Sequence, residues 1–342
     1  MLEYKDDKWK ALLALAPTLL LMVAFTFYPI FNTIISAFME GYSYGVWHDT
    51  DAAIGWLDHF GETVMQSSYN ANEELIGFTS QYIGIGFGNF KNVFQDPTFL
   101  TALKNTSIMV FISVPLTVLI GLFISVALNG IKKAQVVFQT IYFLPYVTNT
   151  IALGLVFSVL FGSKNGLINS ILVAIGGESA RIAWITPFGG DNPTYISCLF
   201  VLMVYTIWNG LAFKILVFLS GMQSIDKQYY QAAQIDSTPR WRVFAKITVP
   251  LLSPMIAYIT ITSFIGAFKA YSSVIALFNG RYGPRSQPNM LITMVGYTYD
   301  KLSKLSNINQ MGRACASALV LFAIIMAITA VELWVSKKKV HY

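Results

Sequence analysis

The chain has 342 residues, of which 55% are hydrophobic and only 12% are charged, and its net charge is +6. Soluble domains carry about 25% charged residues, so this chain has too few charges to cover a surface that faces water. The composition therefore predicts a membrane protein. It contains no nucleic-acid-binding motif, and its two cysteines lie in or beside apolar runs, which argues against a disulfide framework.

Six nearly uncharged runs are long enough to cross about 30 Å of hydrocarbon, which takes roughly 20 helical residues. They lie near residues 12–38, 107–128, 136–161, 194–220, 251–278 and 314–335. The first run has no small-residue cleavage site after it, so it predicts a retained span rather than a signal peptide. The expected fold is an all-α polytopic membrane protein with about six transmembrane helices.

Lysine and arginine in the short loops predict the orientation of these spans. Basic clusters precede the first span and follow the second, fourth and sixth, at residues 5–10, 132–133, 227–246 and 337–339. With six spans, all four clusters fall on one side, which predicts a multi-pass protein of the bacterial plasma membrane with both termini cytoplasmic. The basic segment 279–313 conflicts with this rule, and it is kept outside because reversing it would displace the other clusters.

Residues 41–85 follow the first span, which we assign to a first region at 1–40. They contain several aromatic residues and are expected to form a soluble extracellular insertion. Two interpretations stay open for this segment, a contact with another protein outside the cell and a structured spacer.

The fourth run contains a lysine, Lys214, and the fifth contains Lys269. A lysine in hydrocarbon costs about 2.5–3.5 kcal/mol on insertion scales, so each needs a physical reason. One interpretation is that the long side chain reaches the nearer membrane edge. The other is that the lysine lies on a water-filled pathway.

A polar, basic segment separates the fourth and fifth runs and reads YQAAQIDSTPRWRVFAKITVPLLSP over residues 230–254. Ile225, Tyr229, Ala232 and Ala233 recur at helical spacing, and Pro239 forbids simple continuation of that helix. A short amphipathic helix beside membrane spans is more often a docking element than a catalytic one.

This segment resembles the cytoplasmic EAA loop of permease subunits of binding-protein-dependent ABC importers, in the sugar-uptake branch. The family pattern is approximately E-A-A-x-x-D-G-A, then F, then I-x-x-P and a second proline. The chain matches it at Ala232, Ala233, Asp236, Phe244, Ile247, Pro250 and Pro254, and departs from it at Gln231, Ser237 and Thr238. Ser237 stands where glycine would permit a left-handed helix stop, at a strain of about 1 kcal/mol.

The resemblance extends from about residue 85 to the C-terminus, through the segments 86–106, 166–172 and 208–225. It implies the type I ABC importer permease fold over residues 86–342, with a coupling loop at 222–250. It also implies a second homologous permease, two ATP-binding cassette ATPase subunits and an extracellular solute-binding protein as partners. The residues expected to engage the ATPase are Tyr229, Tyr230, Gln231, Ala232, Ala233, Asp236, Ser237 and Thr238.

No glycine in the chain is followed by lysine, so the phosphate-binding loop G-x-x-x-x-G-K-[ST] is absent. We therefore expect no catalytic residue, cofactor or metal in this chain, and expect ATP and Mg to be used by the partner ATPases. The only acid in a span is Glu332, which we expect to reach water at the cytoplasmic end. This scarcity of acids disfavours a proton-coupled carrier and an intramembrane enzyme.

Phe264, Phe268 and Tyr271 stand at i, i+4 and i+7 of the fifth run, which predicts one helical face. Flat rings suit the C–H faces of sugars, although such stripes are more often packing. Relatives line the pathway with the fourth and fifth spans, so we take these three residues, Lys269 and Asn209 as candidate pathway residues.

The expected function is the membrane-spanning subunit of an ATP-driven importer that moves a carbohydrate, expected to be an oligosaccharide, by alternating access. A permease for glycerol-phosphate or another polar solute is the alternative within this class. An ATP-independent secondary carrier ranks below both, because no internal inverted repeat is visible.

Overall fold

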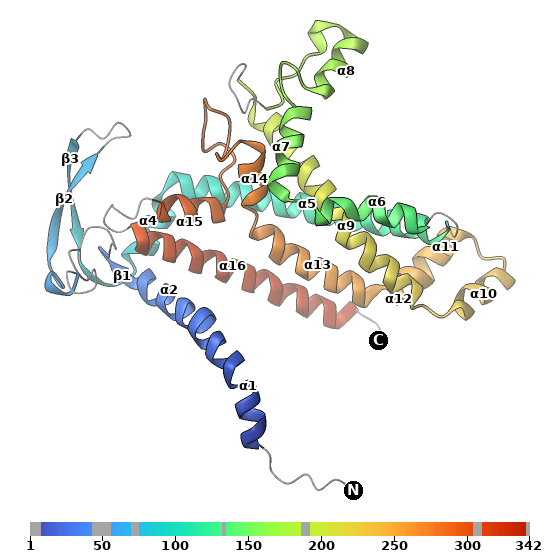
Figure 1. The fold of residues 1–342 in the computed structure, drawn as a ribbon, viewed down its shortest axis with the longest axis horizontal. Coiled ribbons are helices and arrows are strands. Elements are labelled where there is room, and N and C mark those ends of the chain that lie inside the picture. Colours follow the sequence, from blue (N-terminus) through green and yellow to red (C-terminus); the bar gives the residue numbers. More distant parts are fainter. Residues whose placement is uncertain are drawn as a thin grey trace. The chain divides into compact units, whose positions relative to one another are not determined.

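The computed structural model describes residues 8–42, 56–69, 75–131, 135–185, 192–303 and 310–339, most of them helical. The chain divides into two compact units, which are described separately. The first comprises Met1–Asp96 and Thr298–Val320, and the second comprises Pro97–Tyr297 and Leu321–Tyr342. Figure 1 shows the elements in sequence colours, from blue at the N-terminus to red at the C-terminus.

The first unit begins with one long apolar helical segment. It consists of α1 (Lys8–Met22), a π-helical turn η1 (Val23–Phe27) and α2 (Tyr28–Phe38). The π turn immediately precedes Pro29, whose ring and missing N–H disturb the helical hydrogen bonds just before it. The segment Leu12–Phe38 is long and apolar enough to cross a membrane, as the sequence predicts.

The insertion after α2 contains strands that the sequence does not predict. Strand β1 (Met39–Glu40) pairs with β4 (Gly84–Ile85), so the insertion leaves and re-enters the chain at adjacent points. Within it, β2 (Thr63–Tyr69) and β3 (Leu75–Tyr82) form an antiparallel hairpin. The indole of Trp56 is buried and donates to the Glu40 carbonyl at 2.9 Å, which fixes the insertion at its base.

A helix α4 (Gly88–Gln95) then leads to the second unit. The Glu40 carboxylate accepts a hydrogen bond from the Gly88 N–H at 2.6 Å, and the buried Asn89 amide donates to the carbonyls of Ala37 and Met39. A side chain on Gly86 or Gly88 would collide with Glu40. Glycine at both positions therefore leaves room for the Glu40 carboxylate.

Two long helices form the centre of the second unit, α5 (Pro97–Asn129) and α9 (Tyr195–Gln223). Helices in lipid associate mainly by close packing and interhelical hydrogen bonds, which small residues permit. Gly121 of α5 lies against Lys214 and Phe218 of α9, and the Ser125 hydroxyl bonds to the Ile215 carbonyl across the pair at 3.1 Å.

The predicted span at 136–161 is not one helix. It consists of α6 (Gln135–Val147) and α7 (Thr150–Leu160), which meet at 99°. The span is broken because Asn149 begins a new helix, its side chain accepting hydrogen bonds from the N–H groups of Ile151 and Ala152.

A short segment follows α7, with α8 (Leu167–Gly176) and the 3₁₀ turn η2 (Glu178–Ala180). The buried Asn169 holds it together. Its amide donates to the carbonyls of Ser163 and Ile182, and its oxygen accepts from the Trp184 indole.

The C-terminal half contains the remaining helices. They are α10 (Lys227–Ile235), α11 (Arg240–Val243), η3 (Phe244–Thr248), α12 (Val249–Leu251), α13 (Ser253–Phe268), α14 (Ser272–Leu277), α15 (Met294–Leu302) and α16 (Gln310–Lys339). The fifth predicted span, 251–278, extends too far, because α13 ends at Phe268 and a short irregular stretch precedes α14.

Four described helical segments are long and apolar enough to cross a membrane, and two further helix pairs pass the test together but are bent. Counting each bent pair as one span gives six, in agreement with the sequence. The hydropathy pattern does not reveal the bends at residues 148–149 and near Leu252.

Candidate functional site

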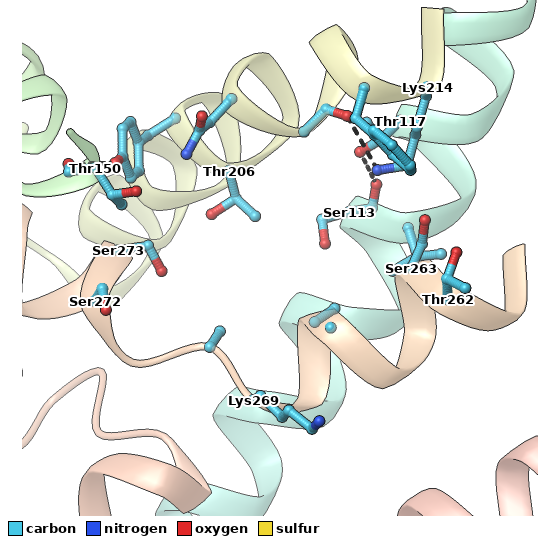
Figure 2. Close-up of a pocket in the computed structure, with 18 of the residues that line it drawn as sticks. Ser113, Thr117, Thr150, Thr206, Lys214, Thr262, Ser263, Lys269, Ser272 and Ser273 are labelled. Atoms are coloured by element: carbon cyan, nitrogen blue, oxygen red, sulfur yellow. Dashed lines mark hydrogen bonds between the residues drawn. The ribbon is translucent and has the colours of Figure 1, made fainter. Parts of the chain in front are cut away.

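The second unit contains a cavity of about 530 Å³ between its apolar helices. Residues of α5, α9 and α13 line it, together with the start of α14 and the bend between α6 and α7. The lining residues are Ser113, Val114, Thr117, Tyr146, Thr150, Tyr205, Thr206, Asn209, Gly210, Phe213, Lys214, Thr262, Ser263, Gly266, Ala267, Lys269, Ala270, Tyr271, Ser272 and Ser273. Figure 2 shows their side chains around the opening.

Eleven of the twenty lining residues carry a hydroxyl group, while most of the exposed lining surface is apolar. The Thr206 and Thr262 hydroxyls donate to the carbonyls of Leu202 and Tyr258 in their own helices, each at 2.8 Å, and Thr117 donates to the Ser113 carbonyl in the same manner. These hydroxyl oxygens keep acceptor capacity toward the cavity. The surface therefore suits a solute rich in hydrogen-bond donors.

Asn209 was predicted to lie on the pathway, and its side chain lines this cavity. Its amide makes no hydrogen bond with another described residue. Because an amide offers both donors and an acceptor, Asn209 can bind a hydroxyl group in either direction.

Two lysines line the cavity, while none of its described lining residues is an aspartate, glutamate or histidine. The Lys214 ammonium donates to the Gly210 carbonyl at 3.1 Å, one turn toward the N-terminus of α9. It therefore points away from the nearer helix end at Gln223 and into the cavity, as the interpretation of a lysine on a pathway expects. Lys269 is exposed and lies on the other side of the opening (Figure 2).

The three aromatic residues predicted to share a face do not share one. Helix α13 ends at Phe268, and Tyr271 has backbone angles of −142° and −56°, which are not helical. Phe268 is 1% exposed, and Phe264 packs edge-to-face on Phe111 with centroids 5.8 Å apart. Of the three rings, only Tyr271 lines the cavity.

A different pair of rings faces the cavity. Tyr146, beside the break between α6 and α7, stacks on Phe213 of α9 with centroids 5.7 Å apart and planes 20° apart. Sequence analysis did not select either residue. Phe213 follows Asn209 at i+4 and so shares its helical face, a signal that could have identified it.

The coupling loop forms the second candidate site. Asp226 begins α10 by accepting a hydrogen bond from the Gln228 N–H at 2.9 Å, and only three residues separate α10 from α9. Figure 1 shows α10 at the far end of this unit from α8, joined through α11 and α12 to α13.

The predicted coupling residues divide between two sides of α10. Tyr230, Ala233, Ser237 and Thr238 line a hollow of about 540 Å³ against residues of α5, α9 and α11, and Ala233 is 7% exposed. The Tyr230 and Thr248 hydroxyls lie 3.3 Å apart there. This side holds the loop against its own chain.

The outward side of α10 is exposed and partly apolar. Tyr229 is 53% exposed and Ile235 is 84% exposed, while Gln231, Ala232 and Asp236 are also exposed. Sequence analysis placed Ala232 and Ala233 on one apolar face, whereas the structure turns them to different sides. Ile235 was not selected, although it follows Ala232 by three residues and so shares its surface.

The end of α10 has the predicted left-handed residue. Ser237 has a φ of 50°, its N–H donates to the Gln234 carbonyl at 3.1 Å, and the Thr238 N–H donates to the Ala233 carbonyl at 2.9 Å. These two bonds define a Schellman motif, in which glycine is the usual left-handed residue.

The profile of the family described as binding-protein-dependent transport system inner membrane component matches residues 114–338. The lactose transport system permease protein LacF of Rhizobium radiobacter is 33% identical over 216 residues, which cover 63% of this chain and 69% of LacF.

The arabinooligosaccharides transport system permease protein AraP of Bacillus subtilis is 30% identical over 254 residues, covering 74% of this chain and 76% of AraP. A solved bacterial alginate ABC transporter, in complex with an alginate pentasaccharide-bound periplasmic protein, contains a chain with a TM-score of 0.74 at 18% identity. The match covers 98% of this chain and 97% of that one. The fold and the resemblance predicted from sequence are confirmed.

Proposed function

This chain belongs to the family of binding-protein-dependent transport system inner membrane components, and we propose that it is the membrane-spanning subunit of an ATP-driven carbohydrate importer. The observation that carries the proposal is the hydroxyl-lined cavity between its apolar helices. A sugar exposes many hydroxyl groups, and these need partners when the sugar leaves water. The names of LacF and AraP, which specify lactose and arabinooligosaccharides, support the same solute class.

The cavity also offers apolar surface suited to sugar rings. The stacked pair Tyr146 and Phe213 presents flat rings, while Asn209 and the hydroxyls around it offer hydrogen bonds. Asn209, Lys269 and Tyr271 remain our pathway residues from the sequence, and Lys214, Tyr146 and Phe213 join them.

The outward side of α10 is the surface that engages an ATPase subunit in this proposal. Two such subunits bind ATP and Mg, a second homologous permease completes the pathway, and an extracellular binding protein delivers the solute. Both termini and α10 face the cytoplasm, in keeping with the lysine and arginine clusters.

Short segments connect α10 to the helices that line the cavity. Residues 224–226 join α10 to α9, and α11, η3 and α12 join it to α13. Because α9 and α13 both line the cavity, a displacement of α10 by the ATPase changes the cavity on both sides. This is the physical basis for alternating access in our proposal.

Purification through a tag on this chain tests the proposal. We expect an ATPase with a phosphate-binding loop and a second six-span protein to accompany it, and mass spectrometry identifies both. Recovery of this chain alone, transporting solute into vesicles without ATP, would replace the importer with a carrier.

The docking surface is tested separately by Ala232→Arg, with Ser179→Arg on the exposed turn η2 as the matched control. The first variant places a bulky charge on the outward side of α10 and should abolish ATP-dependent uptake while the protein still inserts into the membrane. Unchanged uptake in Ala232→Arg would remove α10 as the docking element.

A further inference from the structure

The cavity contains a cation, the Lys214 ammonium, that no acidic side chain among the described lining residues neutralises. Lys214 lies nine residues before the end of α9 at Gln223, about 14 Å along the helix axis. Its ammonium has three donors, and its hydrogen bond to a described residue is to the Gly210 carbonyl, a neutral acceptor. At least one donor is left for another partner.

Two glycines make room for this side chain. A Cβ on Gly121 of α5 would lie 3.2 Å from the Lys214 Cβ, and a Cβ on Gly210 would lie 3.3 Å from its Nζ. Larger residues at either position would displace the lysine. The lysine is therefore held in place by the packing of two helices, and Figure 2 shows it reaching toward Ser113 and Thr117.

The charge balance of the cavity is one-sided. Lys214 and Lys269 line it, and no acidic side chain lines it with them. Glu332, the acid within a membrane-spanning helix, borders a separate groove beside α12 and α13. A cation in a largely apolar segment is stabilised by a counter-ion, so a counter-ion here has to come from outside the described lining.

We propose that Lys214 binds an anionic group, a carboxylate or a phosphate, on the carbohydrate that enters this cavity. The inference rests on the proposed function and narrows it to acidic carbohydrates. The hydroxyls around Lys214 bind the sugar hydroxyls, and the lysine ammonium supplies the charge-assisted hydrogen bond that selects the anion. A neutral sugar of the same size leaves this cation unpaired.

The test measures equilibrium binding of matched probes to the purified complex in lipid nanodiscs. Digalacturonate and galactobiose differ in their carboxylates, and glucose 6-phosphate distinguishes phosphate from carboxylate recognition. We expect the intact complex to bind one of the anionic probes at least about 10-fold more tightly than galactobiose.

Lys214→Met keeps much of the shape and removes the charge, and it should weaken binding of that anionic probe by about 10- to 100-fold while changing galactobiose binding by less than about 3-fold. Lys214→Arg keeps the charge and should retain the preference for the anion. Lys91→Met, an exposed lysine of α4, is the matched control and should leave both affinities unchanged. Size-exclusion profiles and recovery of the partner subunits show whether each variant has folded.

Equal affinity of the intact complex for digalacturonate and galactobiose, with no preference for glucose 6-phosphate, would overturn the inference. So would an equal loss for charged and neutral probes in a folded Lys214→Met variant. A complex that carries its ATPase subunits and binds only galactobiose refutes the charge selection and leaves the proposed function standing. A preparation without ATPase subunits that still loses anion binding on Lys214→Met refutes the importer and keeps this site.

Discussion

Two hollows in the second unit have opposite character. The cavity beside α9 is lined by hydroxyls and two lysines, whereas the groove bordered by α12, α13 and α16 is mostly apolar and contains one acid, Glu332. Helix α13 contributes to both, with Thr262, Ser263 and Gly266 at the cavity and other residues at the groove.

The charged groups of the two hollows, Glu332 in the groove and Lys214 in the cavity, differ in their hydrogen-bond partners. Sequence analysis expected Glu332 to reach water, but both of its carboxylate oxygens are buried and have no hydrogen-bond partner among the described residues. The Lys214 ammonium, by contrast, has a carbonyl partner, a cradle of two glycines and polar neighbours. This difference supports the cavity, rather than the groove, as the solute site in our proposal.

The largest effect should follow from placing an acid in the cavity. Thr117→Asp brings a carboxylate next to Lys214, since the Thr117 methyl and the Lys214 ammonium lie 3.3 Å from the same Gly210 Cβ position. Opposite charges about 4 Å apart attract by about 4 kcal/mol at an effective dielectric constant of 20, so anionic-probe binding should fall more than about 100-fold. Thr117→Asn has nearly the shape of aspartate without its charge, and its binding should fall by no more than about 10-fold through the lost hydroxyl; equal behaviour of the two variants would contradict the charge argument.

The groove should respond to charge removal in the opposite sense. Glu332→Gln keeps the shape and removes a buried charge. We therefore expect the free energy of unfolding to rise by about 1–2 kcal/mol, with uptake unchanged. Glu178→Gln is the control, because Glu178 is exposed and pairs with Arg181 at 2.9 Å on the surface, and its effect should stay below about 0.5 kcal/mol. A lower unfolding temperature in Glu332→Gln would show that the carboxylate has a stabilising partner.

A smaller change tests whether the position of the ammonium matters. Gly210→Ala places a methyl group 3.3 Å from the Lys214 Nζ, and we expect anionic-probe affinity to fall about 3- to 10-fold because the ammonium must shift. Gly266→Ala lines the same cavity and meets no atom within 4 Å, so it serves as the matched control. Equal binding by the two variants would mean that the cavity accepts the ammonium in several positions.

A substitution outside the cavity and the Glu332 groove should have the smallest effect. Ser237→Gly relieves a left-handed residue at the end of α10, and stability should rise by at most about 1 kcal/mol. Ser224→Gly at the end of α9, where φ is −81°, should instead lower stability slightly, because glycine gains only freedom in the unfolded chain there. Calorimetry of both variants checks the opposite signs, and a shared sign would refute the strain at Ser237.

The end of α10 could be predicted from sequence because its interactions are local. The N–H groups of Ser237 and Thr238 bond to carbonyls within five residues of them, so a short motif contains the necessary information. The spans were predictable for a similar reason, since an apolar run of sufficient length is a local property.

The cavity could not be predicted in this way because it depends on where helices stop. Hydropathy continues through Phe268 into residues 269–277, so the sequence conceals the end of α13 and places Tyr271 on a helical face it does not occupy. The stacking of Tyr146 on Phe213 joins residues far apart in the chain and depends on the bend after Val147. The hairpin β2–β3 lies within the insertion, for which only a soluble segment was expected.

The two ends of the insertion lie side by side, where β1 pairs with β4. Met39 pairs with Ile85 and Glu40 with Gly84. The two ends of the insertion are therefore in contact, whatever lies between them. A tight two-residue turn could join Glu40 to Gly84 without moving α2 or α4, and a different sequence could be inserted there equally well. The segment is thus an exchangeable module, whose length and surface can change in evolution or in the laboratory while the membrane-spanning helices keep their connections.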